Sequence, residues 1–197
     1  PGKIEILDSA SQWGGLPSAS ILEAINKLYI ITNDQKYLDF AKYLAESGGS
    51  KYGNQVEQAI ANTTLPYQWG SPKAYELTSY FHGLLGYYNL SGDSKYKTAA
   101  VNYAYDLLKS EVTVTGGVGC KVEEFNYGVR EQASPSYNGA RLETCATVTL
   151  LRFFYDVYLS TGDTVFVDSM ERTLYNQLIS AVDTNDNHEQ VFTSYFS

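Results

Sequence analysis

Apolar residues recur three or four positions apart through most of this 197-residue chain, a spacing that lines them along one face of an α-helix. Ile21, Ile25 and Leu28 follow this spacing in the first part of the chain, and Leu77 and Phe81 follow it further on. The pattern predicts six helices, over residues 18–32, 34–47, 73–90, 94–110, 142–160 and 163–182. We therefore expect an all-α fold.

A short polar turn repeats three times between these helices. Each copy pairs a residue that tolerates a left-handed backbone with an aspartate, and the copies are Asn33-Asp34, Gly92-Asp93 and Gly162-Asp163. Glycine, or asparagine as the second choice, can end one helix, and aspartate can cap the next. The copies lie about 60 and then about 70 residues apart, so we interpret the chain as three antiparallel helical hairpins.

The hairpins are joined by long connections, residues 48–72 and 111–140. Repeated hairpins bury their apolar faces only by stacking, as an open solenoid or as a closed ring. In the second connection, Val112–Thr115 is predicted to be a short strand and Gly116–Gly119 a loop. Loops longer than ~12 to 15 residues are usually functional or disordered, so residues 111–140 are the first place to look for chemistry.

Charge and composition exclude two classes of partner. The chain has 22 acidic and 14 basic residues, for a net charge of −8, and no basic run that could follow a phosphate backbone, so no nucleic acid is predicted. No apolar stretch reaches the ~18 to 20 residues that cross a bilayer, so no membrane is predicted. The two cysteines, Cys120 and Cys145, are compatible with a disulfide, two free thiols or metal ligands.

Glu123 and Glu124 follow the glycine loop and are candidates for acid–base chemistry. Their simple interpretation is a solvated acidic pair. The functional interpretation requires one of these carboxyl groups to face a cleft in which burial or a neighbouring carboxylate raises its pKa. Glycoside hydrolysis needs two catalytic groups that flank the scissile bond. Glu171, beside Arg172 within a predicted helix, is also explained by exposure or by an ion pair.

Glu143 and Cys145 carry the sharpest local signal for a metal. A carboxylate oxygen and a thiolate two residues apart at a helix start can hold one zinc ion, but zinc takes four ligands and only two are visible. The alternative is a capping glutamate beside a buried structural cysteine. Lys73 and Glu76 are compatible with an exposed helix start, and His82 with a core or rim histidine rather than a catalytic base.

Five motifs occur in order along the chain. They are Trp13-Gly14-Gly15-Leu16-Pro17-Ser18-Ala19-Ser20, Lys73-Ala74-Tyr75-Glu76, Thr115-Gly116-Gly117-Val118-Gly119 with Glu123-Glu124-Phe125, Glu143-Thr144-Cys145-Ala146, and Glu171-Arg172-Thr173-Leu174-Tyr175-Asn176. Together they resemble the β-L-arabinofuranosidase family, glycoside hydrolase family 127 and its relatives. Each motif is weak alone, but the set is specific and covers essentially the whole chain.

The resemblance implies an (α/α)6 barrel, a toroid of six helical hairpins. Residues 1–197 would be a single partial catalytic domain with about three hairpins, half of the barrel. The rest of the barrel and the β-sandwich domains of full-length members would lie outside it. Members of the family typically degrade glycans in bacteria, so the resemblance implies a bacterial protein of the cytoplasm or periplasm.

The resemblance also assigns an activity and roles. It implies retaining hydrolysis of terminal β-L-arabinofuranosyl or related sugars of plant glycans, so a glycan is the expected partner. Glu123 corresponds to the general acid/base, with Glu124 as the fallback, and Glu143 and Cys145 correspond to two of the four zinc ligands. The positions assigned to the substrate are Glu171, Tyr195, Lys73, Glu76 and Ser20.

The chain also departs from the family pattern. The family's nucleophile is a cysteine in a downstream Cys-Cys pair that completes the zinc site, and the sequence ends at Ser197 before such a pair. Some relatives carry histidines where this chain has Ser20 and Lys73, which points to a different substrate. The chain alone is therefore expected to be inactive, to bind zinc weakly or not at all, and to self-associate through exposed hairpin faces. Two alternatives are a non-catalytic carbohydrate-binding half-toroid and a helical-repeat interaction scaffold.

Overall fold

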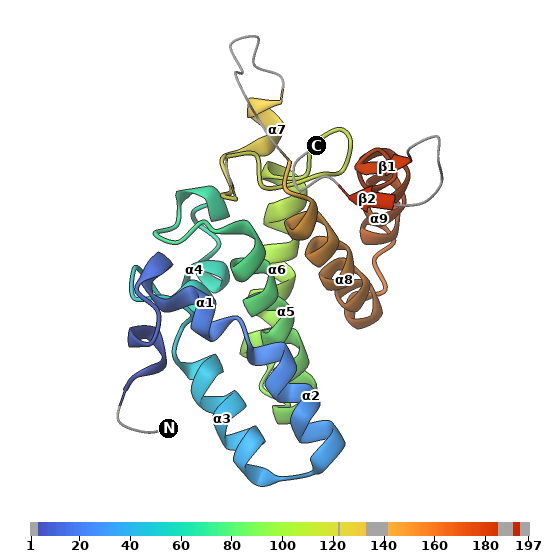
Figure 1. The fold of residues 1–197 in the computed structure, drawn as a ribbon. Coiled ribbons are helices and arrows are strands. Elements are labelled where there is room, and N and C mark those ends of the chain that lie inside the picture. The colour runs from blue at the N-terminus through green and yellow to red at the C-terminus, as the bar shows by residue number, and fades with distance from the viewer. Residues whose placement is uncertain (1–3, 122, 133–141, 185–190, 194–197) are drawn as a thin grey trace.

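The computed structural model describes residues 4–121, 123–132, 142–184 and 191–193. In them the chain forms the three predicted helical hairpins, which makes it an all-α protein with one small β-hairpin (Figure 1). The hairpins are α2 (Leu22–Thr32) with α3 (Gln35–Glu46), α5 (Ala74–Ser91) with α6 (Ser94–Ser110), and α8 (Thr144–Thr161) with α9 (Val165–Thr173).

The hairpins form two rows of helices. The first helices, α2, α5 and α8, pack side by side with α5 in the middle, and α3, α6 and α9 each pack on the helix that precedes them. We call α2, α5 and α8 the inner row. All three helices of this row run in the same direction, so their N-termini lie at one end of the molecule and the hairpin turns at the other (Figure 1).

The turns have the geometry that the repeat predicts. Asn33, Gly92 and Gly162 adopt left-handed φ angles of 52°, 72° and 74°. In each copy the following aspartate accepts a hydrogen bond from the backbone N–H two positions later, at 3.0 to 3.1 Å. This bond satisfies one of the N–H groups that a helix start leaves without a partner, so the sequence signal acts through helix capping.

Aromatic side chains fill the space between the two rows. Phe81 of α5 stacks on Tyr103 of α6, with ring centroids 4.0 Å apart, and Phe153 and Phe154 of α8 extend the cluster. All four are buried. The hydroxyl group of Tyr103 shares a hydrogen bond of 2.9 Å with Thr78, so its polar end is satisfied inside the core.

Some predicted boundaries are wrong. The predicted helix 18–32 is interrupted at Ser20, between α1 (Leu16–Ala19) and α2. Val112–Thr115 is not a strand, because the Thr113 N–H donates to the Gly117 carbonyl at 3.1 Å and closes a turn instead.

The last helix is also shorter than predicted. In place of a helix over 163–182, α9 ends at Thr173 and continues into a π-helical turn, η4 (Leu174–Leu178). The strand β1 (Val182–Thr184) follows and pairs antiparallel with β2 (Val191–Thr193).

The connections contain short elements that were not predicted. α4 (Gln55–Ala61) packs on α6, as does α7 (Gly128–Glu131). Three 3-10 helices complete the described elements: η1 (Ile6–Asp8), η2 (Gln12–Gly15) and η3 (Pro66–Gln68). In the described ranges, no helix combines the length and the apolar composition that crossing a bilayer requires.

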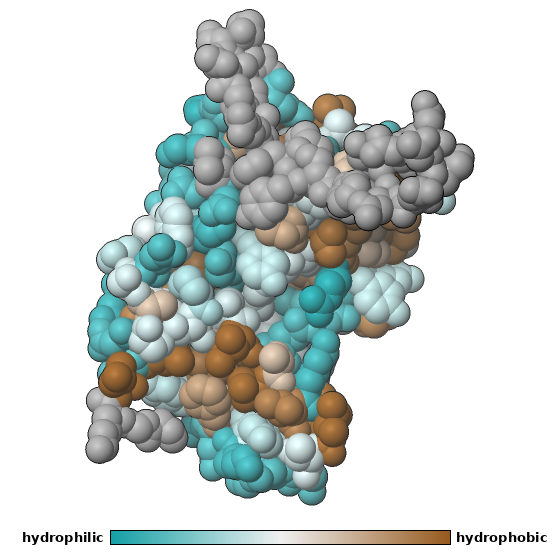
Figure 2. All heavy atoms as spheres, in the orientation of Figure 1, coloured by the Kyte–Doolittle hydropathy of each residue, from teal (hydrophilic) through white to brown (hydrophobic). Residues whose placement is uncertain are grey.

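The two outer helices of the inner row, α2 and α8, carry exposed apolar side chains. Leu28 and Ile31 of α2 are exposed, and Val148 and Leu159 of α8 are exposed on the other side. In Figure 2, apolar surface gathers over α2 in the lower half of the view. Self-association through these faces stays a prediction.

Candidate active site

Buried charged residues gather where α5 and α8 begin. Lys73 directly precedes α5 and Glu143 directly precedes α8, and both are buried. Glu76 lies in the first turn of α5. Buried charges are retained only with partners of opposite sign or good hydrogen bonds, so this end of the inner row is a candidate site.

Lys73 is the centre of this group. Its Nζ lies 3.0 Å from Oε2 of Glu123 and 3.5 Å from Oε2 of Glu76. Burial alone would lower the pKa of Lys73, but the carboxylates of Glu123, Glu76 and Glu143 together raise it above its ordinary value. The ammonium group is therefore charged at neutral pH and faces three carboxylates. We call these four residues, Lys73, Glu76, Glu123 and Glu143, the Lys73 cluster.

Glu76 differs electrostatically from a surface glutamate. Burial raises its pKa, and the nearby Glu143 carboxylate raises it further, while Lys73 acts in the opposite direction. The net result is a raised pKa, so Glu76 holds a proton more readily than an exposed glutamate does.

Backbone hydrogen bonds attach residues 123–125, which we call the acidic segment, to the start of α5. The Ala74 N–H donates to the Glu123 carbonyl at 2.9 Å, and the Phe125 N–H donates to the Pro72 carbonyl at 2.8 Å. The Phe125 ring is buried and meets Tyr103 edge-on, with centroids 6.4 Å apart. The segment is thus anchored on both sides of its two glutamates.

The two adjacent glutamates have different surroundings. The Glu123 carboxylate pairs with buried Lys73 and is 37% exposed, so solvent can reach it. Glu124 pairs instead with Lys121, at 3.4 Å, whose side chain is largely exposed. Glu123 also has a φ of 72°, which is strained for a residue with a side chain, and such strain often marks functional positions.

The glycine loop connects this segment to α8 and α9. The Glu143 N–H donates to the Val118 carbonyl at 3.0 Å. Gly119 has a φ of 81°, and a Cβ atom there would lie 3.2 Å from Cβ of Glu143. At Gly116 a Cβ atom would lie 2.5 Å from Cα of Thr173. Close backbone approach explains why glycine occupies both positions.

Glu143 and Cys145, the residues predicted to bind a metal, are in contact with each other. The Cys145 thiol donates a hydrogen bond to Oε1 of Glu143 at 2.8 Å, so a sulfur and a carboxylate oxygen lie together at the start of α8. These donors suit zinc. Among the described residues there is no group of three or more His, Cys, Asp or Glu side chains placed to hold a metal, so zinc binding by this pair stays a prediction.

Cys120 has a different environment from Cys145. The two cysteines form no disulfide. Burial, with the negative charges of Glu111 and Glu131, raises the pKa of the Cys120 thiol to about 12. The protonated thiol is therefore the favoured form of Cys120 in this environment.

Ser20 and Glu171, two other predicted substrate residues, have different contacts. Ser20 donates to the Pro17 carbonyl at 2.8 Å. Glu171 lines a surface hollow on α9 and η4 with Arg172 and Tyr175. In the described part of the chain, neither Ser20 nor Glu171 has a hydrogen bond or ion pair to the Lys73 cluster. Tyr195 lies outside the described residues.

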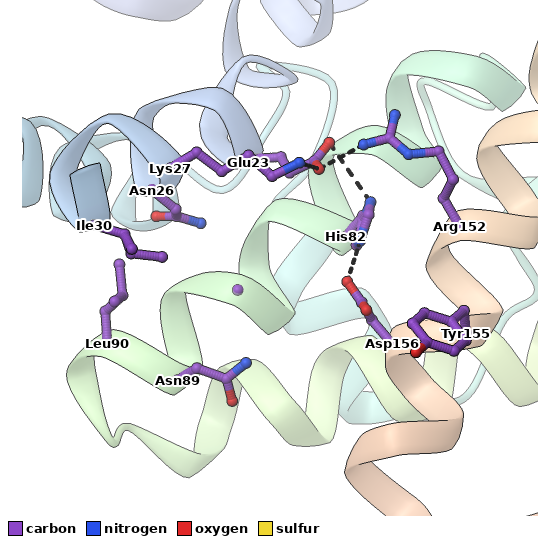
Figure 3. Close-up of a pocket in the computed structure, with 11 residues that line it drawn as sticks. Glu23, Asn26, Lys27, Ile30, His82, Asn89, Leu90, Arg152, Tyr155 and Asp156 are labelled. Atoms are coloured by element: carbon purple, nitrogen blue, oxygen red, sulfur yellow. Dashed lines mark hydrogen bonds and ion pairs between the residues drawn. The ribbon is translucent and has the colours of Figure 1, made fainter.

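His82 belongs to a second polar cluster, formed by side chains of α2, α5 and α8. Its Nε2 lies 2.5 Å from Oδ2 of Asp156, and its Nδ1 lies 3.7 Å from Oε2 of Glu23. Glu23 also pairs with Arg152 at 2.6 Å. These side chains point toward one another from α2, α5 and α8 and line a cavity of about 410 Å³ (Figure 3). His82 is buried between two carboxylates, in agreement with the core interpretation.

Sequence reasoning did not single out Glu111. Its carboxylate is fully buried and accepts hydrogen bonds from the backbone N–H groups of Asn126, Tyr127 and Gly128, at 3.1 to 3.2 Å. The one available signal was its position at the C-terminus of α6, where the connection to the glycine loop begins.

Comparison with known proteins decides the family. The chain matches the family described as "Beta-L-arabinofuranosidase, GH127 catalytic domain" over residues 8–195. The chain belongs to this glycoside hydrolase family. No curated protein matches it at a significant level.

Solved structures support the same assignment. A GH127 β-arabinofuranosidase is 26% identical, with a TM-score of 0.63 over 91% of this chain and 27% of its own length. A GH127 β-L-arabinofuranosidase from Geobacillus stearothermophilus T6 is 25% identical, with a TM-score of 0.65 over 88% of this chain and 30% of its own. A structure described as a glycoside hydrolase, 21% identical with a TM-score of 0.63, shares the fold.

The chain spans less than a third of the length of these GH127 enzymes. Their fold is a helical toroid, and the three hairpins of this chain correspond to part of it.

Proposed function

We propose that this chain supplies the acid/base residue and part of the zinc site of a retaining glycosidase that acts on terminal β-L-arabinofuranosyl or related sugars. The observation that supports this most is the placement of Glu123. Its carboxylate is solvent-accessible, lies in a strained turn, and is held by buried Lys73 beside the starts of α5 and α8. Family membership supports the hydrolase class.

Glu123 is the residue that moves the proton in this proposal. In the first half of a retaining reaction the protonated carboxyl group gives its proton to the departing glycosidic oxygen, and in the second half the carboxylate takes a proton from water. Lys73 orients the carboxylate through the ion pair of 3.0 Å. Glu124, paired with exposed Lys121, is the weaker candidate.

Glu143 and Cys145 are the residues that would hold zinc. When bound, zinc would act as a Lewis acid and favour the thiolate form of cysteine ligands. The nucleophile in this proposal is a cysteine of the family's downstream pair, outside this chain. Glu171, Tyr195, Lys73, Glu76 and Ser20 remain the proposed contacts to the sugar.

The test compares Glu123→Gln with the matched neighbour Glu124→Gln, in a protein that joins this chain to the downstream cysteine pair. With aryl β-L-arabinofuranosides, we expect Glu123→Gln to lower kcat/KM by about 10² to 10⁴ for a poor leaving group and much less for one that departs without a proton. Glu124→Gln should change the rate little.

Two other outcomes would change the assignment. If the large loss followed Glu124→Gln instead, Glu124 would be the acid/base. If the protein bound sugars with equal affinity before and after Glu123→Gln and hydrolysed none, the carbohydrate-binding alternative would replace the enzyme proposal.

A further inference from the structure

Glu111 makes an unusual set of contacts for a residue at a helix end. Its Oε2 accepts the N–H groups of Asn126 and Gly128, at 3.2 and 3.1 Å, and its Oε1 accepts that of Tyr127, at 3.2 Å. The Ser110 hydroxyl group donates to Oε1 at 3.3 Å. Three consecutive backbone donors on one buried carboxylate form an anion-binding turn, here filled by a side chain of the chain itself.

The sequence position of this turn connects it with the candidate acid/base. Asn126 follows Phe125, whose N–H is bonded to Pro72, and Glu123 lies three residues before Asn126. The acidic segment is therefore held at α5 by its own backbone and at α6 by Glu111. Tyr127 has a φ of 57°, so the turn that presents the three N–H groups is itself strained and needs a partner to persist.

We propose that Glu111 is a positioning residue that fixes Glu123 against the start of α5 by binding the backbone of residues 126–128. This inference rests on the proposed role of Glu123 and extends it to a residue that does not touch the reacting atoms. The structural alternative is that Glu111 only closes its own local turn.

The balance of charge around Glu111 makes its contacts sensitive to pH. Burial raises its pKa to about 7, although the three backbone N–H groups and Ser110 favour the ionised form. The ionisable groups that interact with it are Tyr103 on α6 and Cys120 in the loop, and Glu131 of α7 acts on Cys120. None of these is a cation, so the N–H groups are what stabilises the carboxylate.

Amide hydrogen exchange on the intact chain tests the proposal. The variant is Glu111→Gln, and the matched control is Asp106→Asn, which removes another buried carboxylate from α6 that accepts no hydrogen bond from residues 126–128. We expect Glu111→Gln to reduce protection about tenfold at Asn126 to Gly128 and also at Ala74, whose N–H is bonded to Glu123. The control should leave these amides unchanged.

A pH series adds a readout that simple packing would not move. In the wild type, protection at these amides should fall as pH rises through about 7, beyond the intrinsic change in exchange rate, because opening the turn solvates Glu111 and lowers its raised pKa, so ionisation favours the open form. In Glu111→Gln this step should be absent. Glu111→Asp keeps the charge and should keep the step at a weakened level, and it serves as the variant if Glu111→Gln does not fold.

One result would overturn the proposal. If the variants lose protection at Asn126 to Gly128 while Ala74 and Phe125 keep theirs, Glu111 closes a local turn and positions nothing. Because the readout is amide exchange, a failure to hydrolyse sugars would leave this inference standing, and a failure here would leave Glu123 as the acid/base.

Discussion

Lys73 and Glu123 form an ion pair of 3.0 Å in which the cation is almost fully buried and the carboxylate is partly open to solvent. Removing the cation leaves Glu123, Glu76 and Glu143 facing one another. We expect Lys73→Met to lower the free energy of unfolding at pH 7 by about 2 kcal/mol, less than the ~3 to 5 kcal/mol for breaking a fully buried pair, because Glu123 is partly solvated. Urea denaturation measures this loss.

Lys27→Met is the matched control for that substitution. Lys27 pairs with Glu23 at 2.6 Å, but its side chain is 61% exposed, so its loss should cost about 0.5 kcal/mol or less. Equal losses in the two variants would mean that the Lys73 cluster is no more strongly coupled than a surface pair.

Zinc content distinguishes the two cysteines. In a protein that carries this chain together with the downstream cysteine pair, we expect Cys145→Ala to remove most bound zinc after dialysis, because its thiol converges with Glu143. Cys120→Ala should leave zinc unchanged, since burial and nearby negative charge keep that thiol protonated. Elemental analysis gives the zinc content, and retention of zinc in Cys145→Ala would remove Cys145 from the proposed site.

Gly119→Ala tests whether the glycine loop sets the position of Glu143. The residue needs a left-handed backbone, which costs about 1 kcal/mol for alanine, and its new Cβ atom would lie 3.2 Å from Cβ of Glu143. Gly92 has a similar φ of 72°, and a Cβ atom there would have no heavy atom within 4 Å. Gly92→Ala therefore carries the backbone cost alone. We expect both variants to lose stability in urea and only Gly119→Ala to lose zinc affinity.

Stability against pH should reveal Glu111. Its pKa is raised from 4.5 in the unfolded chain to about 7 by burial, so its stabilising contribution is present below pH 4.5 and is lost as pH rises through about 7. Relative to Glu111→Gln, the wild type should lose about 3 kcal/mol across this window, as an order of magnitude. Urea denaturation at several pH values measures the difference. A flat difference for Glu111→Gln would contradict the raised pKa.

The helical hairpins were predictable because their signals are local. A left-handed residue followed by an aspartate ends one helix and caps the next, whatever the rest of the molecule does, as Gly92 and Asp93 illustrate. The strand predicted at Val112–Thr115 failed for the opposite reason. β-branched residues favour a strand only where a partner strand is available, and here Thr113 bonds to Gly117 four residues on.

The candidate site was only partly predictable. Glu123, Glu143 and Cys145 were proposed from motifs, and the structure adds that Lys73 ties Glu123 to α5. Glu111 carried no motif, because its role depends on backbone groups that lie 15 to 17 positions later in the chain. Hydrogen bonds between a side chain and a distant backbone leave no periodic trace in a sequence.

The two ends of the inner row differ in a way that bears on how the chain can be altered. The charged groups lie where α5 and α8 begin, and the hairpin turns lie a full helix length away, roughly 27 Å for the 18 residues of α5. At Gly92 and Gly162 the surroundings are open. Fluorescent labels, affinity tags or inserted loops therefore belong at these turns, where they would report on the chain without disturbing the carboxylates of the Lys73 cluster.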